Sequence, residues 1–251
     1  MQNKLSRNRK TTPDRIVLSI PHASTFLPDR AGYTSEELVN DEISLLTDWY
    51  ADKIFEVPNI NAVKATVSRI YCDVERLSDD AEPMSKFGMG IIYNKTDRGQ
   101  ILRQIDNSKK QEIIRKYYNP FHKALEDAVS DKLKEYGECL IIDCHTYSDQ
   151  PFKRDLDQAE PRADICIGTD EIHTPPNVTD TIINFFTKRG FSVKENSPYV
   201  GCIVPRKYYQ NPNVHSVMIE INRKLYMTDN KVNWQKIAQL HNIISELYNY
   251  L

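Results

Sequence analysis

A continuous apolar run near the middle of the 251-residue chain constrains its fold more than any other feature. Residues 138–144 read ECLIIDC, and such a run is typical of a strand that is buried on both faces of a parallel sheet. Other strand-like runs alternate with stretches of helical periodicity along the chain. This alternation predicts an α/β fold in which helices cover both faces of a sheet.

The predicted elements follow from hydrophobic periodicity and from capping and turn residues. Strands are predicted at residues 15–20, 62–72, 90–94, 138–144, 164–168, 191–194 and 216–221, and helices at residues 35–55, 107–136, 177–189 and 234–251. Thr34 or Ser35 is a candidate N-cap of the first helix. Pro120 is expected to bend the second helix, because proline lacks a backbone donor.

The stretch 77–99 shows little periodicity, and we predict a long loop there, of a kind that is often functional. No internal repeat, low-complexity tract or linker divides the chain. We therefore predict one domain over residues 1–251, in which residues 1–14 form a polar, flexible tail.

Composition argues against several classes of partner and location. The formal net charge is -2, which gives no general attraction to nucleic acid or to anionic membranes. The basic N-terminal segment is not followed by the apolar stretch of a secretory signal, and no run approaches the ~20 apolar residues of a membrane span. The five cysteines form no CxxC pair, so a cytoplasmic protein without disulfides is expected. The glycine-rich motifs of nucleotide-binding proteins are also absent.

Three polar clusters follow strand-like runs of the sequence. They are Pro21-His22, Asp73-Val74-Glu75-Arg76 and Asp143-Cys144-His145-Thr146. Ligands of open α/β sheets bind at the carboxyl ends of strands, so the clusters are expected to converge on one site. Two histidines and a carboxylate form the ligand set of a catalytic zinc site that keeps one position open. A carboxylate often orients a metal-bound imidazole, although a single histidine at a strand end is more often structural.

A glutamate interrupts the apolar run SVMIEI at residues 216–221. Burying an unpaired carboxylate is costly, so Glu220 either forms an ion pair or faces a polar site. One alternative is an ion pair with Arg223 at the protein surface. The other is a general base near a metal-bound water, with a pKa tuned by burial.

Six stretches, in this order, resemble the N-formylglutamate amidohydrolase family. They are LSIPHAS at 18–24, TDWY at 47–50, SRIYCDVER at 68–76, YYNPFHKAL at 117–125, IIDCHTYS at 141–148 and MIEINRKLYM at 218–227. The resemblance extends from Ile16 to Met227. It implies a three-layer architecture, with a mixed, mostly parallel sheet flanked by helices, similar to the fold of zinc-dependent exopeptidases.

The resemblance also implies a metal centre. His22 and His145 would hold a divalent ion, Zn²⁺ or another metal. Asp48 in the TDWY stretch would be the third ligand, and Asp73 is the rival for that position. Glu220 would be the general base.

By the same resemblance, Arg76 would bind a carboxylate of the substrate, because the guanidinium fork pairs with a carboxylate through two parallel hydrogen bonds. The other residues predicted to bind substrate are Arg69, Arg206 and Asn222. Asp73, Asp143 and His122 are predicted to lie behind the metal ligands, with bracing of its own helix as the alternative for His122.

The resemblance therefore implies a metal-dependent hydrolase that cleaves the amide bond of an N-acyl amino acid, with a small, carboxylate-bearing molecule as substrate. Pro198 stands where the family pattern has an arginine, and Ser24 where it has a glycine, so the acylated amino acid need not be glutamate. Two alternatives remain. One is a ligand-binding family member without turnover, and the other is a zinc exopeptidase that acts on small peptides. The oligomeric state is not predicted.

Overall fold

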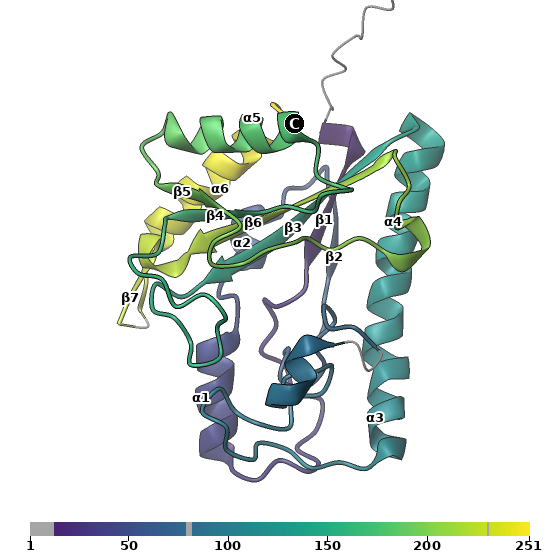
Figure 1. The fold of residues 1–251 in the computed structure, drawn as a ribbon, viewed down its shortest axis with the longest axis vertical. Coiled ribbons are helices and arrows are strands. Elements are labelled where there is room, and N and C mark those ends of the chain that lie inside the picture. The colour runs from purple at the N-terminus through teal and green to yellow at the C-terminus, as the bar shows by residue number, and fades with distance from the viewer. Residues whose placement is uncertain (1–12, 79–81, 230) are drawn as a thin grey trace, which may run out of the picture.

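The computed structural model describes residues 13–78, 82–229 and 231–251, and its centre is a six-stranded sheet. The strand order is β2-β1-β3-β6-β4-β5 (Figure 1). The strands are β1 (Ile16–Ile20), β2 (Asn61–Lys64), β3 (Cys139–Tyr147), β4 (Ile165–Gly168), β5 (Val193–Glu195) and β6 (Val214–Asn222). Strands β2, β1, β3 and β6 are parallel, whereas β4 runs antiparallel to β6 and parallel to β5. The prediction of a mixed, mostly parallel sheet is confirmed.

Helices cover both faces of the sheet. They are α1 (Glu36–Leu46), α2 (Ala51–Phe55), α3 (Asn107–Ile113), α4 (Asn119–Tyr136), α5 (Pro176–Thr187) and α6 (Trp234–Leu247). Helices α2, α5 and α6 pack on one face and α4 packs on the other, which gives the three predicted layers (Figure 1). Helices α1 and α3 extend away from the sheet. A small hairpin of β7 (Met227–Thr228) and β8 (Lys231–Val232) was not predicted.

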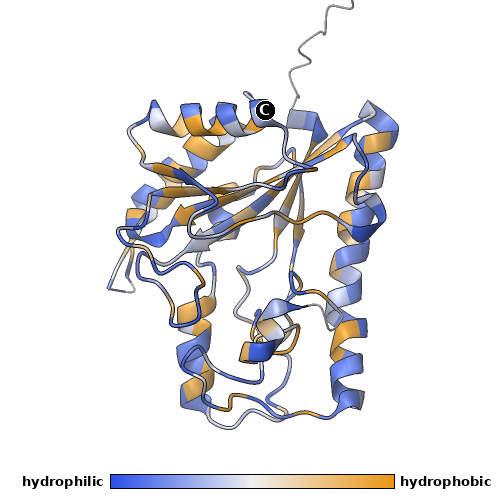
Figure 2. Ribbon diagram, viewed as in Figure 1, coloured by the Kyte–Doolittle hydropathy of each residue, from blue (hydrophilic) through white to orange (hydrophobic). Residues whose placement is uncertain are grey.

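Side chains along the central strands alternate between two faces of the sheet. One face is apolar throughout, and the other changes from apolar to polar along the strands. On β3, Leu140 and Ile142 contribute to the core beneath α2, α5 and α6. Ile141 points the other way and belongs to the core beneath α4, but Asp143 and His145 follow it on the same face. Figure 2 shows the apolar strands between helices that are polar on their outer sides. The α4 face is therefore apolar at the N-terminal ends of the strands and polar at their carboxyl ends.

The helix predicted at residues 35–55 is interrupted by a turn. Ser35 caps its start as predicted, and α1 ends at Leu46. The guanidinium of Arg223 donates hydrogen bonds to the carbonyl oxygens of Leu45 and Thr47, so a distant residue caps this helix end. The turn 47–50 places Asp48 outside both helices, where its side chain points toward the carboxyl ends of the strands.

The strand predicted at residues 62–72 is much shorter than its pattern indicates. Strand β2 ends at Lys64, and residues 65–78 continue as a series of turns. Asp73 therefore does not lie at a strand end, and its backbone N–H is instead bonded to the carbonyl of Ile91 at 2.8 Å. Apolar residues of this stretch are buried without being part of a strand: Val67 lies in the core beneath α4, and Ile70 lies in a separate core with Val39 and Leu46 of α1.

Smaller differences concern the loop, the second helix and the tail. The strand predicted at 90–94 is reduced to an isolated bridge between Met89 and Tyr93. Before Pro120, the helix widens into one π turn at Ile114–Tyr118. Of the tail predicted at 1–14, residues 1–12 lie outside the described part of the chain, and the last two belong to a 3₁₀ helix, Pro13–Arg15.

That residues 1–251 form a single domain stays a prediction.

Further 3₁₀ helices occur at Pro83–Phe87, Arg206–Tyr208 and Arg223–Leu225. Within the described ranges, no helix has the length and the apolar character needed to cross a membrane.

The central strand offers a test of the core. Ile142 has no exposed surface, so Ile142→Ala should lower the free energy of unfolding by about 2–5 kcal/mol through lost burial and a residual cavity. Ile172→Ala, at an exposed position, should change it by less than about 0.5 kcal/mol. Urea denaturation followed by circular dichroism measures both, and equal small changes would contradict the assignment of β3 as the central buried strand.

Candidate active site

The polar half of the α4 face opens into a cavity of about 680 Å³, which we call the central cavity. It is bounded by the carboxyl ends of β3 and β6 and by loops that precede and follow the sheet strands. The charged and ionisable residues at its base include His22, Asp48, Arg69, Glu75, Arg76, His145 and Glu220. The sequence cluster that follows β1 and the cluster in the C-terminal half of β3 thus meet at one site, and the cluster at 73–76 joins them from a loop.

Two histidines and one aspartate converge at the base of the cavity. The Nδ1 atom of His145 lies 2.9 Å from Oδ2 of Asp48, and Nδ1 of His22 lies 3.8 Å from the same oxygen. Backbone bonds fix this turn, because Asp48 N–H donates to the carbonyl of His22 at 3.1 Å. One ligand atom from each of the three side chains lies within 4.8 Å of the others.

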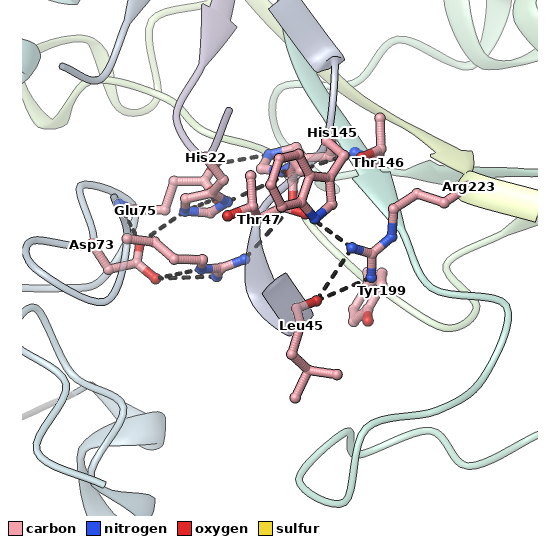
Figure 3. A network of polar contacts seen from close by, with 12 residues as sticks. His22, Leu45, Thr47, Asp73, Glu75, His145, Thr146, Tyr199 and Arg223 are labelled. Atoms are coloured by element: carbon pink, nitrogen blue, oxygen red, sulfur yellow. Dashed lines mark hydrogen bonds and ion pairs between the residues drawn. The ribbon is translucent and has the colours of Figure 1, made fainter. Parts of the chain in front are cut away.

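The opposite nitrogen of each ring faces a carboxylate. Nε2 of His22 lies 2.9 Å from Oδ1 of Asp73, and Nε2 of His145 lies 3.2 Å from Oε1 of Glu75 (Figure 3). Nε2 of His145 also lies 3.3 Å from Oδ1 of Asp143. A carboxylate only accepts hydrogen bonds, so these contacts place a proton on each Nε2. By the same argument Nδ1 of His145 donates a proton to Asp48 at 2.9 Å, and a bound cation would displace that proton. Nδ1 of His22 is buried without a hydrogen bond in the described structure.

These residues fit a divalent metal. The orphaned Nδ1 of His22 supplies a free donor atom, and the set of two imidazoles and one carboxylate suits zinc. Carboxylates behind both rings provide the orientation that metal-binding histidines need.

Asp73 is engaged by other groups. Its Oδ1 accepts from His22 and from the N–H of Glu75, and its Oδ2 accepts from Arg69 at 3.0 and 3.3 Å and from the hydroxyl of Tyr93 at 2.7 Å. Burial raises the pKa of Asp73, but His22, Arg69 and Arg76 outweigh burial and hold the pKa well below its ordinary value. Both oxygens are therefore occupied, which favours Asp48 over Asp73 as the third ligand.

The base of the cavity holds more acids than bases. Five carboxyl groups gather there, those of Asp48, Asp73, Glu75, Asp143 and Glu220, against the two guanidinium groups of Arg69 and Arg76. Burial, together with the charge of Glu75, raises the pKa of Asp143 to about 6. Burial lowers the pKa of His145, but the surrounding carboxylates outweigh it and hold the pKa well above its ordinary value. A bound cation would be stabilised by this excess of acidic groups and would offset their mutual repulsion.

Glu220 lies beside His145, since the two residues are register partners in the parallel pair of β3 and β6. Its side chain is buried, with 7% of the residue exposed, and Oε2 has no hydrogen-bond partner in the described residues. Burial raises the pKa of Glu220 to about 8. Arg223 instead binds the carbonyl oxygens of Leu45 and Thr47 (Figure 3), and no ion pair between it and Glu220 occurs among the residues that the structure describes.

The predicted substrate-binding residues separate into two groups. Arg69 and Arg76 line the central cavity, and Nε of Arg76 lies 3.5 Å from Oδ2 of Asp73. Arg206 is exposed in its 3₁₀ helix and is not among the residues that line the cavity. Asn222 is fully buried, and its amide nitrogen donates to Asp149 and to the carbonyl of Ala163, so it holds neighbouring segments together.

His122 lies behind the site. Its Nε2 donates to the carbonyl of Val74 at 2.8 Å, and its ring lies against Tyr118. Burial lowers the pKa of His122, which favours the neutral ring. The side chain therefore braces the loop that carries Glu75 and Arg76, and it is not among the cavity lining.

Sequence reasoning missed two residues of the site. Glu75 was noted within its cluster but given no role, although its carboxylate reaches Nε2 of both histidines, at 3.4 Å from His22 and 3.2 Å from His145. Tyr93 comes from the predicted loop and donates to Asp73. The DVER motif was a signal for Glu75, whereas nothing in the sequence marked Tyr93.

Comparisons with known proteins place this geometry in context. The family model described as N-formylglutamate amidohydrolase matches residues 14–227. A crystal structure of N-formylglutamate amidohydrolase from Ralstonia eutropha JMP134 is 25% identical with a TM-score of 0.81, over 93% of this chain and 91% of that chain. A gene product of Agrobacterium tumefaciens, 18% identical with a TM-score of 0.65 over 93% of this chain and 87% of that one, shows a likeness of fold alone. No curated protein matches the chain.

The convergence of the histidines predicts a measurable metal site. Purified protein that has been offered zinc should hold about one ion per chain, and His22→Ala and His145→Ala should each lose it, because a tetrahedral site cannot spare a protein ligand. Plasma mass spectrometry of the desalted proteins measures this. His241→Ala, on α6, is the matched control and should keep the ion. Retention of zinc by both site variants would rule out this ligand set.

Proposed function

Because the chain belongs to the N-formylglutamate amidohydrolase family, we propose that it is a metal-dependent hydrolase of N-acyl amino acids, with His22, Asp48 and His145 as the metal ligands. The observation that carries this proposal is the convergence of both Nδ1 atoms on Asp48 beside a buried glutamate. That arrangement combines a cation site with a proton acceptor in one cavity.

A divalent ion held by these ligands would supply Lewis acidity, which polarises a carbonyl group and makes water a stronger nucleophile. The protein's own groups prepare the ligands for this task. Asp73, Asp143 and Glu75 accept from the Nε2 atoms and orient both rings so that each Nδ1 faces Asp48. His122 and Tyr93 hold the loop that carries these acceptors in place.

Glu220 is the proposed general base. Its partnerless Oε2 can accept a proton from the attacking water. The water oxygen bonds to the carbonyl carbon, the bond between carbon and nitrogen breaks, and Glu220 passes the proton to the leaving nitrogen. The products are a carboxylic acid and a free amino acid. A pKa raised to about 8 by burial suits a group that must both accept and release a proton near neutral pH.

Arg76 is the proposed anchor of the substrate carboxylate. Its Nε atom is buried without a hydrogen bond among the described residues, and it lines the cavity next to Glu75. Arg69 is less available, because it donates twice to Asp73. The carboxylate of an N-acyl amino acid lies two bonds from the amide nitrogen, so an arginine at the base of the cavity can position that amide for hydrolysis.

The general-base role predicts a loss of turnover without a loss of metal. Glu220→Gln keeps the shape of the side chain but cannot accept the proton, so kcat should fall by about 10²–10⁴-fold. Hydrolysis is followed by chromatography of the released amino acid, over a panel of N-acyl amino acids and dipeptides. Zinc content measured on the same sample should equal that of the wild type. Undiminished hydrolysis would exclude Glu220 as the base, and a preference for dipeptides would favour an exopeptidase.

The anchoring role of Arg76 predicts a change in substrate affinity. Arg76→Lys keeps the charge beside Asp73 but loses the planar fork, so KM should rise about tenfold or more. The increase should vanish for a substrate whose carboxylate is replaced by a carboxamide. Arg115→Lys, at an exposed position of the π turn, is the control. An equal effect on the acid and on the amide would contradict carboxylate recognition.

A further inference from the structure

The mouth of the central cavity is unusually apolar. Leu77, Leu156 and Val200 are 51%, 84% and 71% exposed, and all three line this cavity. Single exposed apolar side chains are common on protein surfaces, but three from separate segments around one opening form a patch. An apolar part of a ligand that enters the cavity would cover them.

The inner wall continues this character. Its apolar members include Met84, Met89, Phe152, Pro198, Tyr199 and Met218. The methionines among them adapt to side chains of different shape. The wall formed by residues 198–200 is thus suited to aliphatic or aromatic groups.

Most of the basic groups of the cavity are already committed. Arg223 donates to two backbone carbonyls. Arg154 donates to the carbonyl of Asp97 at 2.8 Å and to that of Phe87. Arg69 is bound to Asp73. Of the arginines that line the cavity in the described structure, Arg76 alone donates no hydrogen bond to a carboxylate or a backbone carbonyl, although its Nε lies 3.5 Å from Oδ2 of Asp73.

The wall near Pro198 also carries negative charge. Asp155 and Asp157 line the cavity there, and Asp157 accepts a hydrogen bond from the hydroxyl of Ser197 at 2.7 Å. Arg162 neutralises Asp155 through a contact of 2.6 Å. Hydrogen bonds from Ala159 and Ser197 lower the pKa of Asp157, which therefore stays ionised. A second carboxylate placed against this wall would meet the negative charge of Asp157, and apart from Arg76 none of the described residues that line the cavity offers it an unengaged cation.

We propose that the central cavity selects N-acyl amino acids with an apolar side chain and a single carboxylate, the side chain lying against residues 198–200 and the apolar rim. This inference rests on the proposed function, because it assigns the α-carboxylate to Arg76. It makes Leu156, Val200 and Asp157 specificity-determining residues. N-formylglutamate, with two carboxylates, is then a poor substrate.

The test compares substrates of similar size and different charge. The zinc-loaded protein is assayed with N-formyl-L-methionine, N-formyl-L-leucine, N-formyl-L-glutamine and N-formyl-L-glutamate. We expect kcat/KM to be at least about tenfold higher for the methionine and leucine compounds than for the glutamate compound. The glutamine compound separates repulsion of charge from loss of apolar contact and should fall between them.

Variants assign the selectivity to named side chains. Leu156→Ser and Val200→Ser should lower the preference for the apolar compounds several-fold, and Asp157→Asn should raise kcat/KM for the glutamate compound. Ile172→Ser removes an exposed apolar side chain that is not part of the cavity lining and should leave the preference unchanged.

A binding measurement keeps this inference separate from the proposed function. Calorimetric titration of zinc-loaded Glu220→Gln with the same compounds reports selectivity without turnover. Apolar-selective binding with no hydrolysis by the wild type would support the pocket assignment and overturn the hydrolase proposal. Preferred binding or hydrolysis of N-formyl-L-glutamate would overturn the inference while the hydrolase proposal stands. Failure of every compound to bind would overturn the inference as well.

Discussion

The parallel pairing of β3 with β6 is the interaction on which the rest of the structure depends. It joins nine residue pairs in one register, from Cys139 opposite Val214 to Tyr147 opposite Asn222. That register places His145 beside Glu220, and a shift by one residue would turn every side chain of one strand to the opposite face. The same alternation that buries Leu140 and Ile142 under the helices thus delivers the chemical groups to the α4 face.

A second constraint is electrostatic. The site gathers buried carboxyl groups that could not share one low-dielectric region without compensation. Arg69 neutralises the charge of Asp73, and the hydroxyl of Tyr93 donates a hydrogen bond to it. The histidine rings lie between the remaining acids. The acids therefore form two groups that differ in position. Those behind the rings set the tautomer, whereas Asp48 and Glu220 face the space where the reacting groups would lie.

The sequence predicted the groups that depend on local pattern. His22, His145 and Glu220 follow or interrupt apolar strands, so strand periodicity places them at the carboxyl edge of the sheet. The pattern failed where distant contacts decide the conformation. Residues 65–72 alternate like a strand, but Val67 is buried in the core beneath α4 and Ile70 in a separate core with α1, and neither lies in a strand. Glu75 contacts both rings because the chain leaves the sheet at this point, and the DVER motif marks the residue without indicating those contacts.

The turn that carries Asp48 is held by residues far along the chain. Arg223 donates to the carbonyl of Thr47, 176 positions away, and the hydroxyl of Tyr226 donates to the carbonyl of Trp49. During synthesis, the first half of the chain therefore emerges without the groups that shape this turn. The nascent protein can hold the turn that carries Asp48 through these contacts only after Arg223 and Tyr226 have left the ribosome. The Asp48 turn therefore gains these contacts only once most of the chain has been made.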